Sequence, residues 1–225
     1  MIKRGIFLFF ILMACFAHLF GQDIITAEKY LEMVSDNYSA IRDYEAVIAI
    51  RSGNADMGGN VSYLSPSFMR IDFTRPSGQV IVFNGDALIV YLPEFRAVLN
   101  QNINRRPGAS GAGLASSQGL SLLKRNYVSS FVTGPTPEPL DTGERVVNLR
   151  LTRRSVSERF REIVLSINPE TKLIRRIVGR TIGETELRFD FTNIRLNVGI
   201  PEARFAYETP PSANMYDNFL FRDSN

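Results

Sequence analysis

The feature that most constrains this chain is the stretch from Val61 to Pro93, in which three apolar runs are separated by turn residues. Apolar and polar residues alternate from Phe68 to Thr74. The apolar positions of that run share one face: Met69, Ile71 and Phe73. Alternation with a period of two residues is typical of a strand with one buried face and one solvent-exposed face. Because Asn84-Gly85 tolerates the positive φ of a tight hairpin, the stretch predicts an antiparallel meander with one apolar face.

Other elements are expected on both sides of this meander. Thr26 can cap a helix over 26–41 whose apolar residues recur at helical spacing, and a second helix is expected over 120–131. A strand is expected over 44–51, followed by a turn over 53–59 that Gly58-Gly59 favours. Further strands are expected over 95–100, 145–152, 161–168, 173–180 and 185–196. Such regular spacing favours a mainly β protein with helices (α+β), built on one antiparallel sheet that curls.

The N-terminal segment, residues 1–21, has the composition of a signal peptide. Lys3 and Arg4 precede an apolar run over 5–20, and Gly21 offers a small residue for cleavage. The alternatives are a buried N-terminal helix and acylation of Cys15, because Leu12-Met13-Ala14-Cys15 resembles a relaxed lipoprotein box. Residues 22–225 are expected to form a single domain.

Removal of that segment would take away the only histidine, His18, and the only cysteine, Cys15. The remaining chain would lack the residues for a Ser-His-Asp triad, a cysteine nucleophile, a disulfide or a His/Cys metal site. We therefore expect no catalytic residues, no metal and no cofactor. A carboxylate, lysine or tyrosine mechanism would remain possible. The enzymatic alternative is of the carboxylate type, but no spacing singles out Asp72, Asp86 or Glu94.

The charge balance gives no reason to expect nucleic acid. The whole chain carries 26 basic and 23 acidic residues, so loss of Lys3 and Arg4 leaves 26 − 2 = 24 against 23, or about +1. The paired arginines are scattered along the chain and are typical of solvated strand faces.

The order of motifs resembles the LolA family of periplasmic lipoprotein carriers and its lipoprotein-sorting relatives. The first half carries these motifs: Tyr63, Pro66, the strand 68–73, Pro76, the strand 80–83, Asn84-Gly85 and Tyr91-Leu92-Pro93. The second half adds the turn 168–172 and an ending over 205–211, Phe-Ala-Tyr-Glu-Thr-Pro-Pro. The resemblance covers essentially all of 22–225 and implies a curled, incompletely closed antiparallel β-barrel with a helical lid.

The resemblance also implies a function, in which acyl chains lie between the sheet and the helices. The implied partners are acylated lipoproteins, an inner-membrane lipoprotein-release complex and an outer-membrane acceptor, and the implied compartment is the periplasm. Burial of one CH₂ is worth about 0.8 kcal/mol, so a chain of roughly 15 methylenes represents roughly 12 kcal/mol that a carrier must offset. The expected cavity lining is Val34, Met69, Ile71, Phe73, Ile81, Ile89, Tyr91 and Leu123. The alternative is that the same side chains fill a dry core.

One departure from the family concerns the lid. The family's well-studied carriers place an arginine, which pins the lid, immediately before the first motif proline, and this chain has Ser65 there. Arg70 and Arg75 are the candidates to replace it. The alternative function is a lipid-sensing regulatory or receptor module on the same fold, either soluble or anchored through Cys15.

Overall fold

The computed structural model describes residues 25–102 and 115–219. The expected signal segment 1–21, with Cys15, lies outside the described residues. The helices are α2 (Ala27–Ser39) and α3 (Ser117–Asn126), with short 3-10 turns η2 (Pro93–Phe95) and η4 (Glu202–Phe205). The strands are β1 (Asp43–Ser52), β2 (Ala55–Leu64), β3 (Phe68–Arg75), β4 (Val80–Phe83), β5 (Ala87–Leu92), β6 (Ala97–Asn102), β7 (Tyr127–Phe131), β8 (Glu138–Pro139), β9 (Arg145–Arg153), β10 (Phe160–Ile167), β11 (Ile174–Thr181), β12 (Glu186–Leu196) and β13 (Asn214–Asp217).

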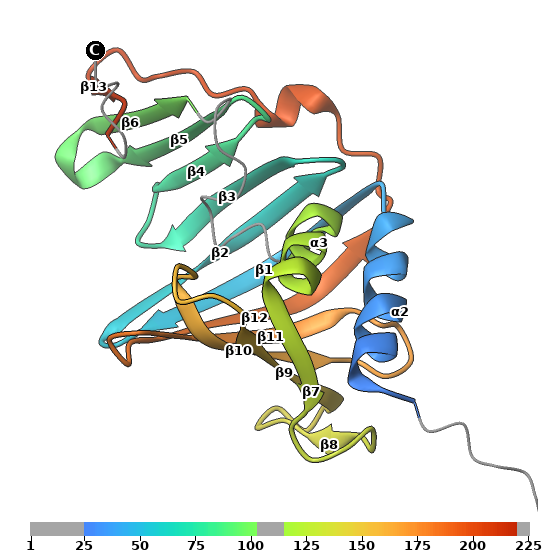
Figure 1. Cartoon of the computed structure of the whole chain (residues 1–225). Coiled ribbons are helices and arrows are strands. Elements are labelled where there is room, and N and C mark those ends of the chain that lie inside the picture. Colours follow the sequence, from blue (N-terminus) through green and yellow to red (C-terminus); the bar gives the residue numbers. More distant parts are fainter. Residues whose placement is uncertain (1–24, 103–114, 220–225) are drawn as a thin grey trace, which may run out of the picture.

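These strands form one strongly bent sheet in the order β13-β6-β5-β4-β3-β2-β1-β12-β11-β10-β9-β7, with β8 paired to β9 (Figure 1). The end strands β7 and β13 are not neighbours within this described order, so the sheet is open. Neighbouring strands are antiparallel except β13, which pairs parallel to β6. The expected fold class, a curled and incompletely closed antiparallel sheet with helices, is confirmed.

Helices α2 and α3 lie against one face of the sheet, which we call the inner face (Figure 1). The Thr26 side chain caps α2 by accepting from the Lys29 backbone N–H at 3.2 Å. The apolar stripe of α2 is buried: Tyr30, Leu31, Val34 and Tyr38. It packs in one core with alternate residues of β1, of which Tyr44, Ala46, Ile48 and Ile50 are buried. Alternation in the strand and helical spacing in the helix thus meet in the same core.

The second helix is shorter than expected. The sequence predicted helix over 120–131, but α3 ends at Asn126 and Tyr127 is extended, with φ −127° and ψ 156°. Tyr127 and Phe131 belong to β7, which pairs with β9. Their spacing of four fits either structure, because Tyr127, Ser129 and Phe131 also alternate with the exposed Val128 and Ser130. Pairing with a distant strand decides between the two.

The expected turn over 53–59 is also wrong in part. The chain turns at Gly53-Asn54, and both Gly58 and Gly59 lie inside β2. A Cβ on Gly59 would lie 2.4 Å from the Asp72 carbonyl oxygen. This glycine therefore permits close approach of β3 at a bulge rather than a turn.

The opposite, outer face is covered at β3–β5 by the C-terminal segment. Phe205 is 1% exposed and packs in a second apolar cluster with Val82 and Ile200. Its ring centroid lies 5.5 Å from that of Phe68. The segment continues past η4 to β13, at the edge of the sheet (Figure 1). Strands β4 and β5 are therefore apolar on both faces.

A charge cluster fixes the loop after β8 to the outer face of β11 and β12. One carboxylate oxygen of Asp141 lies 2.6 Å from Arg176 Nη2, and the other lies 2.9 Å from Arg188 Nη2. Both arginines also pair with Asp190. Hydrogen bonds from the two guanidinium groups lower the pKa of Asp141 from 3.8 to about 2.

We expect Phe205→Ala to lower the free energy of unfolding by about 3 kcal/mol, because it leaves a cavity beneath the C-terminal segment. Phe95→Ala is the matched control: Phe95 is 70% exposed, and loss of an exposed ring should change stability by about 0.5 kcal/mol or less. Urea denaturation of both variants gives the comparison. Equal effects of the two substitutions would contradict the second cluster.

We expect the Asp141 contacts to make folding depend on pH in the acid range. Because the folded-state pKa is the lower one, stability from this group is complete well above pH 3.8 and is lost as the pH falls through about 2. Carboxyl NMR titration should show Asp141 protonating near pH 2, and Asp141→Asn should remove that part of the acid dependence. Titration of Asp141 at its ordinary value would contradict the arrangement.

Candidate functional site

A row of apolar side chains crosses the inner face from the covered core to the edge of the sheet. Strand register places its members directly opposite one another, in the order Val61, Ile71, Ile81, Val90, Leu99 and Tyr216. Val61 and Ile71 are each 1% exposed, whereas Tyr216 at the edge is 53% exposed. The three side chains between them are half-buried. The row therefore passes from dry core to solvent without a polar interruption.

A second row runs beside it, with Tyr63, Met69, Phe83 and Leu88 directly opposite one another. Phe83 is half-buried and packs against the main core, and the other three are buried. The two rows make the inner face of β4 and β5 an apolar surface. Apolar side chains need no hydrogen-bond partners, so such a surface suits a hydrocarbon ligand.

Six of the eight residues expected to line a lipid cavity lie on this inner side. Met69, Ile71 and Phe73 are buried on β3, and Ile81 is half-buried beside them on β4. The other two come from the helices: Val34 in α2 and Leu123 in α3, which are 0% and 2% exposed. All but Ile81 are part of the buried core.

Ile89 and Tyr91 do not join this group. Ile89 pairs with Val82 and packs with the second cluster on the outer face. Tyr91 pairs with Val80, and its ring centroid lies 6.0 Å from that of Tyr207 in the C-terminal segment. The expectation that they share a face with Ile81 is corrected, because Ile81 is opposite Val90.

The residues that sequence reasoning missed are Phe83, Val90 and Leu99. Hairpin parity was the available signal. A two-residue turn at Asn84-Gly85 would pair Phe83 with Asp86, an even-numbered residue. Because residues on one face of a strand are two apart, Ile81 would then also lie opposite an even-numbered residue of the next strand. In the structure four residues, 84–87, separate the paired Phe83 and Leu88, which keeps this parity, and Asn84 Oδ1 accepts from the Ala87 N–H at 2.9 Å.

Beneath the helices, apolar side chains of α2, α3 and the sheet pack together in one core. A cavity of about 10 Å³ lies between the helices and the sheet, roughly the room that one water molecule needs. Its lining is Tyr38, Tyr44, Ala115, Leu173, Ile174, Phe191, Ile194 and Leu196. An acyl chain could occupy this region only if the helices moved.

Two buried tyrosines link the helical layer to the sheet. The Tyr44 hydroxyl on β1 donates to the Ala115 carbonyl oxygen at 3.1 Å, just before α3. The Tyr38 hydroxyl on α2 accepts from the Ile174 backbone N–H at 3.0 Å on β11. Burial raises the pKa of Tyr38 to about 12 and that of Tyr44 well above 10, so both hydroxyls are neutral at physiological pH. These bonds persist at any pH at which the protein works.

The two arginines proposed to control the lid lie elsewhere. Arg70 Nη2 pairs with Asp72 at 2.9 Å on the outer face, and Arg70 Nη1 donates to the Arg204 and Ala206 carbonyl oxygens. It therefore holds the C-terminal segment. Arg75 pairs with Asp56 at 3.2 Å, between β3 and β2. The lid-control expectation is corrected for both, since their described partners lie outside α2 and α3.

Ser65, which replaces the family arginine, lies in the β2–β3 turn. Its backbone N–H donates to the Arg42 carbonyl oxygen at 2.8 Å. The tyrosine hydrogen bonds join the helical layer to β1 and β11, and Asn37 Nδ2 of α2 donates to the Thr171 carbonyl oxygen at 3.1 Å in the turn before β11.

The described residues show no group of three or more His, Cys, Asp or Glu side chains that could hold a metal ion. The carboxylates considered for catalysis are dispersed: Asp72 is paired on the outer face, while Asp86 and Glu94 lie in turns at opposite ends of β5. Within the described ranges no helix has the length and apolar character needed to cross a bilayer.

Comparison with solved structures supports the fold. An uncharacterised conserved protein from Thermus thermophilus aligns over 85% of this chain and 98% of its own, with 14% identity and a TM-score of 0.57. The lipoprotein LppX from Mycobacterium tuberculosis aligns over 78% and 97%, with 12% identity and a TM-score of 0.51. Pseudomonas aeruginosa MucB in its complex with MucA aligns over 84% of this chain but only 62% of that one, with 13% identity and a TM-score of 0.51. At these identities the likeness concerns the fold alone.

No functionally curated protein gives a significant sequence match. The model of the family described as outer membrane lipoprotein carrier protein LolA matches residues 51–208. This range runs from the end of β1 through the meander, α3 and the second half of the sheet to the outer-face segment. The chain therefore belongs to the LolA family.

Proposed function

We propose that this protein is a periplasmic carrier that binds the acyl chains of lipoproteins on its inner face and delivers them toward the outer membrane without covalent chemistry. The observation that carries this proposal is the apolar row whose exposure rises from Ile71 to Tyr216. Family membership supports it, because the matching model is that of a lipoprotein carrier.

The row offers a way to bind a chain in steps. The half-buried side chains Ile81, Phe83, Val90 and Leu99 present the first apolar surface, without any movement of the helices. Each methylene that leaves water there gains about 0.8 kcal/mol. Further binding toward Ile71 would require α2 and α3 to separate from the sheet.

The filled interior fits the empty form of such a carrier. An open apolar cavity in water would be unfavourable, so the helices close over the sheet when no ligand is bound. Opening must expose core residues such as Val34, Leu123 and Met69, and the ligand must then replace their contacts. A chain that supplies many methylenes can offset this cost.

The proposal requires partners and a compartment. The expected cargo is an acylated lipoprotein, loaded by an inner-membrane lipoprotein-release complex and passed to an outer-membrane acceptor. Export would remove residues 1–21, leaving 22–225 as one lipid-binding domain. Neither a nucleotide nor another cofactor is needed, because transfer depends only on a better acceptor for the chain.

The second candidate is a lipid-sensing regulatory or receptor module on the same fold. The likeness to MucB, solved in a complex with MucA, motivates it at the level of fold. Mass spectrometry of the processed N-terminus separates an anchored module from a shuttle. Acylation at Cys15 would favour the receptor, and cleavage after Gly21 would leave the soluble carrier.

Ile81 and Ile89 form a matched pair that tests the inner face. Both are half-buried isoleucines on neighbouring strands, but they lie on opposite faces of the sheet. We expect Ile81→Asn to weaken capture of a triacylated lipoprotein about tenfold, since about 1.4 kcal/mol of apolar contact is lost, and Ile89→Asn to leave affinity near that of the parent.

Native mass spectrometry of the processed protein with the lipoprotein measures both affinities, and thermal unfolding confirms that both variants fold. Equal loss in the two variants would contradict the inner-face site. Failure of the parent protein to capture any acylated lipoprotein would contradict the carrier function itself.

Tyr44→Phe tests whether the helices must move. It removes the hydrogen bond to Ala115 while keeping the ring, and should lower stability by about 1 kcal/mol. If separation of the helices limits uptake, the variant should take up a fluorescent fatty acid several-fold faster than the parent. Stopped-flow fluorescence measures this rate.

Tyr63→Phe is the control for that experiment. Its ring lies 5.1 Å from that of Tyr44, but its hydroxyl donates to the Pro66 carbonyl oxygen within the sheet at 3.2 Å. We expect its uptake rate to match that of the parent. Unchanged uptake in Tyr44→Phe would show that this bond does not restrain the helices.

A further inference from the structure

The three most exposed large apolar side chains among the described residues lie in hairpin turns. Val156 is 80% exposed between β9 and β10, Phe95 is 70% exposed between β5 and β6, and Ile182 is 60% exposed between β11 and β12. A single exposed apolar residue needs no explanation. These three residues, however, are not scattered over the surface.

All three turns lie at the same end of the strands. Because neighbouring strands alternate in direction, the turns β1–β2, β3–β4, β5–β6, β9–β10 and β11–β12 all fall at one end, and β2–β3, β4–β5 and β10–β11 fall at the other. The second set of turns contains no exposed large apolar side chain, and at that end Leu196 and Val198, where β12 ends, are 38% and 46% exposed. We call the first end, with Phe95, Val156 and Ile182 at its tips, the apolar rim.

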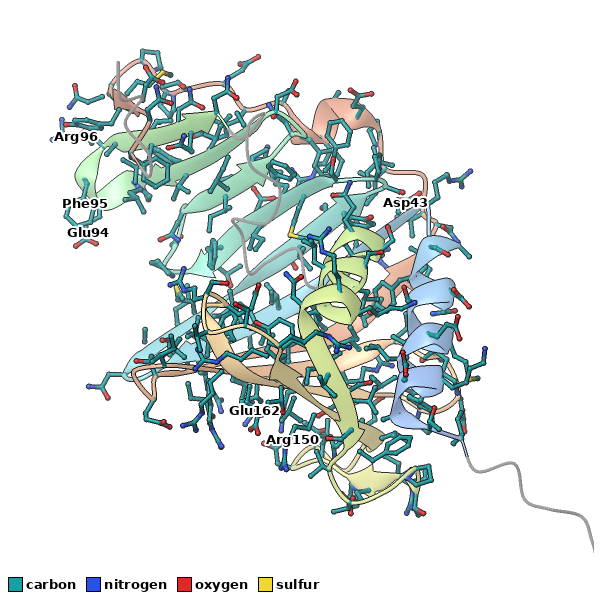
Figure 2. All side chains as sticks on the ribbon, in the orientation of Figure 1. Asp43, Glu94, Phe95, Arg96, Arg150 and Glu162 are labelled. Atoms are coloured by element: carbon teal, nitrogen blue, oxygen red, sulfur yellow. The ribbon has the colours of Figure 1, made fainter. Side chains whose placement is uncertain are left out.

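Phe95 is held in a defined position although its ring is mostly in water. It ends the 3-10 turn η2, which Pro93 begins, and Arg96 follows in the left-handed region at φ 45°. The Arg96 N–H donates to the Pro93 carbonyl oxygen at 3.1 Å, and the Arg96 carbonyl oxygen accepts from the Asn214 N–H at 2.8 Å. Figure 2 shows Phe95 at the extremity of the molecule, between Glu94 and Arg96. The left-handed conformation is unfavourable for a residue with a side chain, so these two hydrogen bonds help to hold the turn in place.

The charge of the rim differs from that of the opposite end. With two strand residues included on each side, its turns are 51–56, 74–81, 91–98, 152–161 and 180–187. They contain eight arginines and five acidic residues, and 8 − 5 gives +3. The opposite turns, 63–69, 82–88 and 166–175, contain two basic and two acidic residues and are neutral. The excess positive charge therefore lies at the end that carries the apolar tips.

We propose that the apolar rim is a membrane-contact site, which docks on the surface of a bilayer that contains anionic phospholipid. Apolar side chains that enter the interfacial region, together with arginines that meet anionic head groups, are the combination that binds proteins to bilayer surfaces. The tips project from the strand ends, so they can enter a bilayer without any change in the fold. This inference does not rest on acyl-chain binding, since a carrier and a lipid sensor could both use it.

The chain offers a clean reporter, because it contains no tryptophan. We would compare Phe95→Trp and Ile182→Trp with Val198→Trp, in the protein as purified from the producing cell. Val198 is 46% exposed and follows β12, at the opposite end of the strands. Each variant is mixed with vesicles of phosphatidylcholine, with or without phosphatidylglycerol.

The two rim tryptophans should shift their emission to shorter wavelength and be quenched by brominated lipid when phosphatidylglycerol is present, whereas Val198→Trp should do neither. Added salt should weaken the effect. A variant with serine at Phe95, Val156 and Ile182 should co-sediment with these vesicles at least tenfold less than the parent. The tryptophan contrast is between positions in one protein, so it holds for either form of the N-terminus. The co-sedimentation comparison uses protein without an acyl anchor.

Rim tryptophans whose emission matches that of Val198→Trp would overturn the membrane-contact site. So would a triple serine variant that co-sediments like the parent. Equal binding to vesicles without phosphatidylglycerol would overturn the role of the arginines. Acyl-chain capture is measured without vesicles, so a failure here is distinct from a failure of the proposed function.

Discussion

The two-residue period of a β-strand is the constraint on which this structure depends. Each strand residue faces either the helices or the outside, and antiparallel pairing extends that choice to every neighbouring strand. Ile71 faces inward, so Ile81, Val90 and Leu99 face inward as well. The apolar row, the helical layer above it and the C-terminal segment on the other face all follow from this register.

The two faces of β3–β5 are covered in different ways. On the outer face the covering segment is held by charge, because Arg70 and Arg204 both reach Asp72 and Arg70 also donates to carbonyl oxygens of that segment. On the inner face the helices are held mainly by apolar packing, with hydrogen bonds at Tyr38, Tyr44 and Asn37. Apolar packing can be replaced by a hydrocarbon ligand, whereas a charge network cannot. The inner cover is thus the one that an acyl chain can displace.

The sequence predicted what local patterns determine. Alternation from Phe68 to Thr74 placed Met69, Ile71 and Phe73 correctly, and helical spacing located α2 to within two residues at its C-terminal end. It failed where a distant partner decides. β7 depends on pairing with β9, and the role of Arg70 depends on carbonyl groups more than 130 residues away. No pattern within one segment records such partners.

The errors at Ile89 and Tyr91 have a different cause, since the required signal was local. Hydrophobicity alone could not show which face of β5 points inward. The register across the Asn84 turn does show it, because it places Val90 opposite Ile81. Both faces of β5 are apolar: Leu88 and Val90 lie on the inner face, and Ile89 packs with Ile200 and Phe205 on the outer face. A strand that is apolar on both faces shows no alternation. Its inner face can then be assigned only by following the register from β3, which does alternate, through β4 to β5.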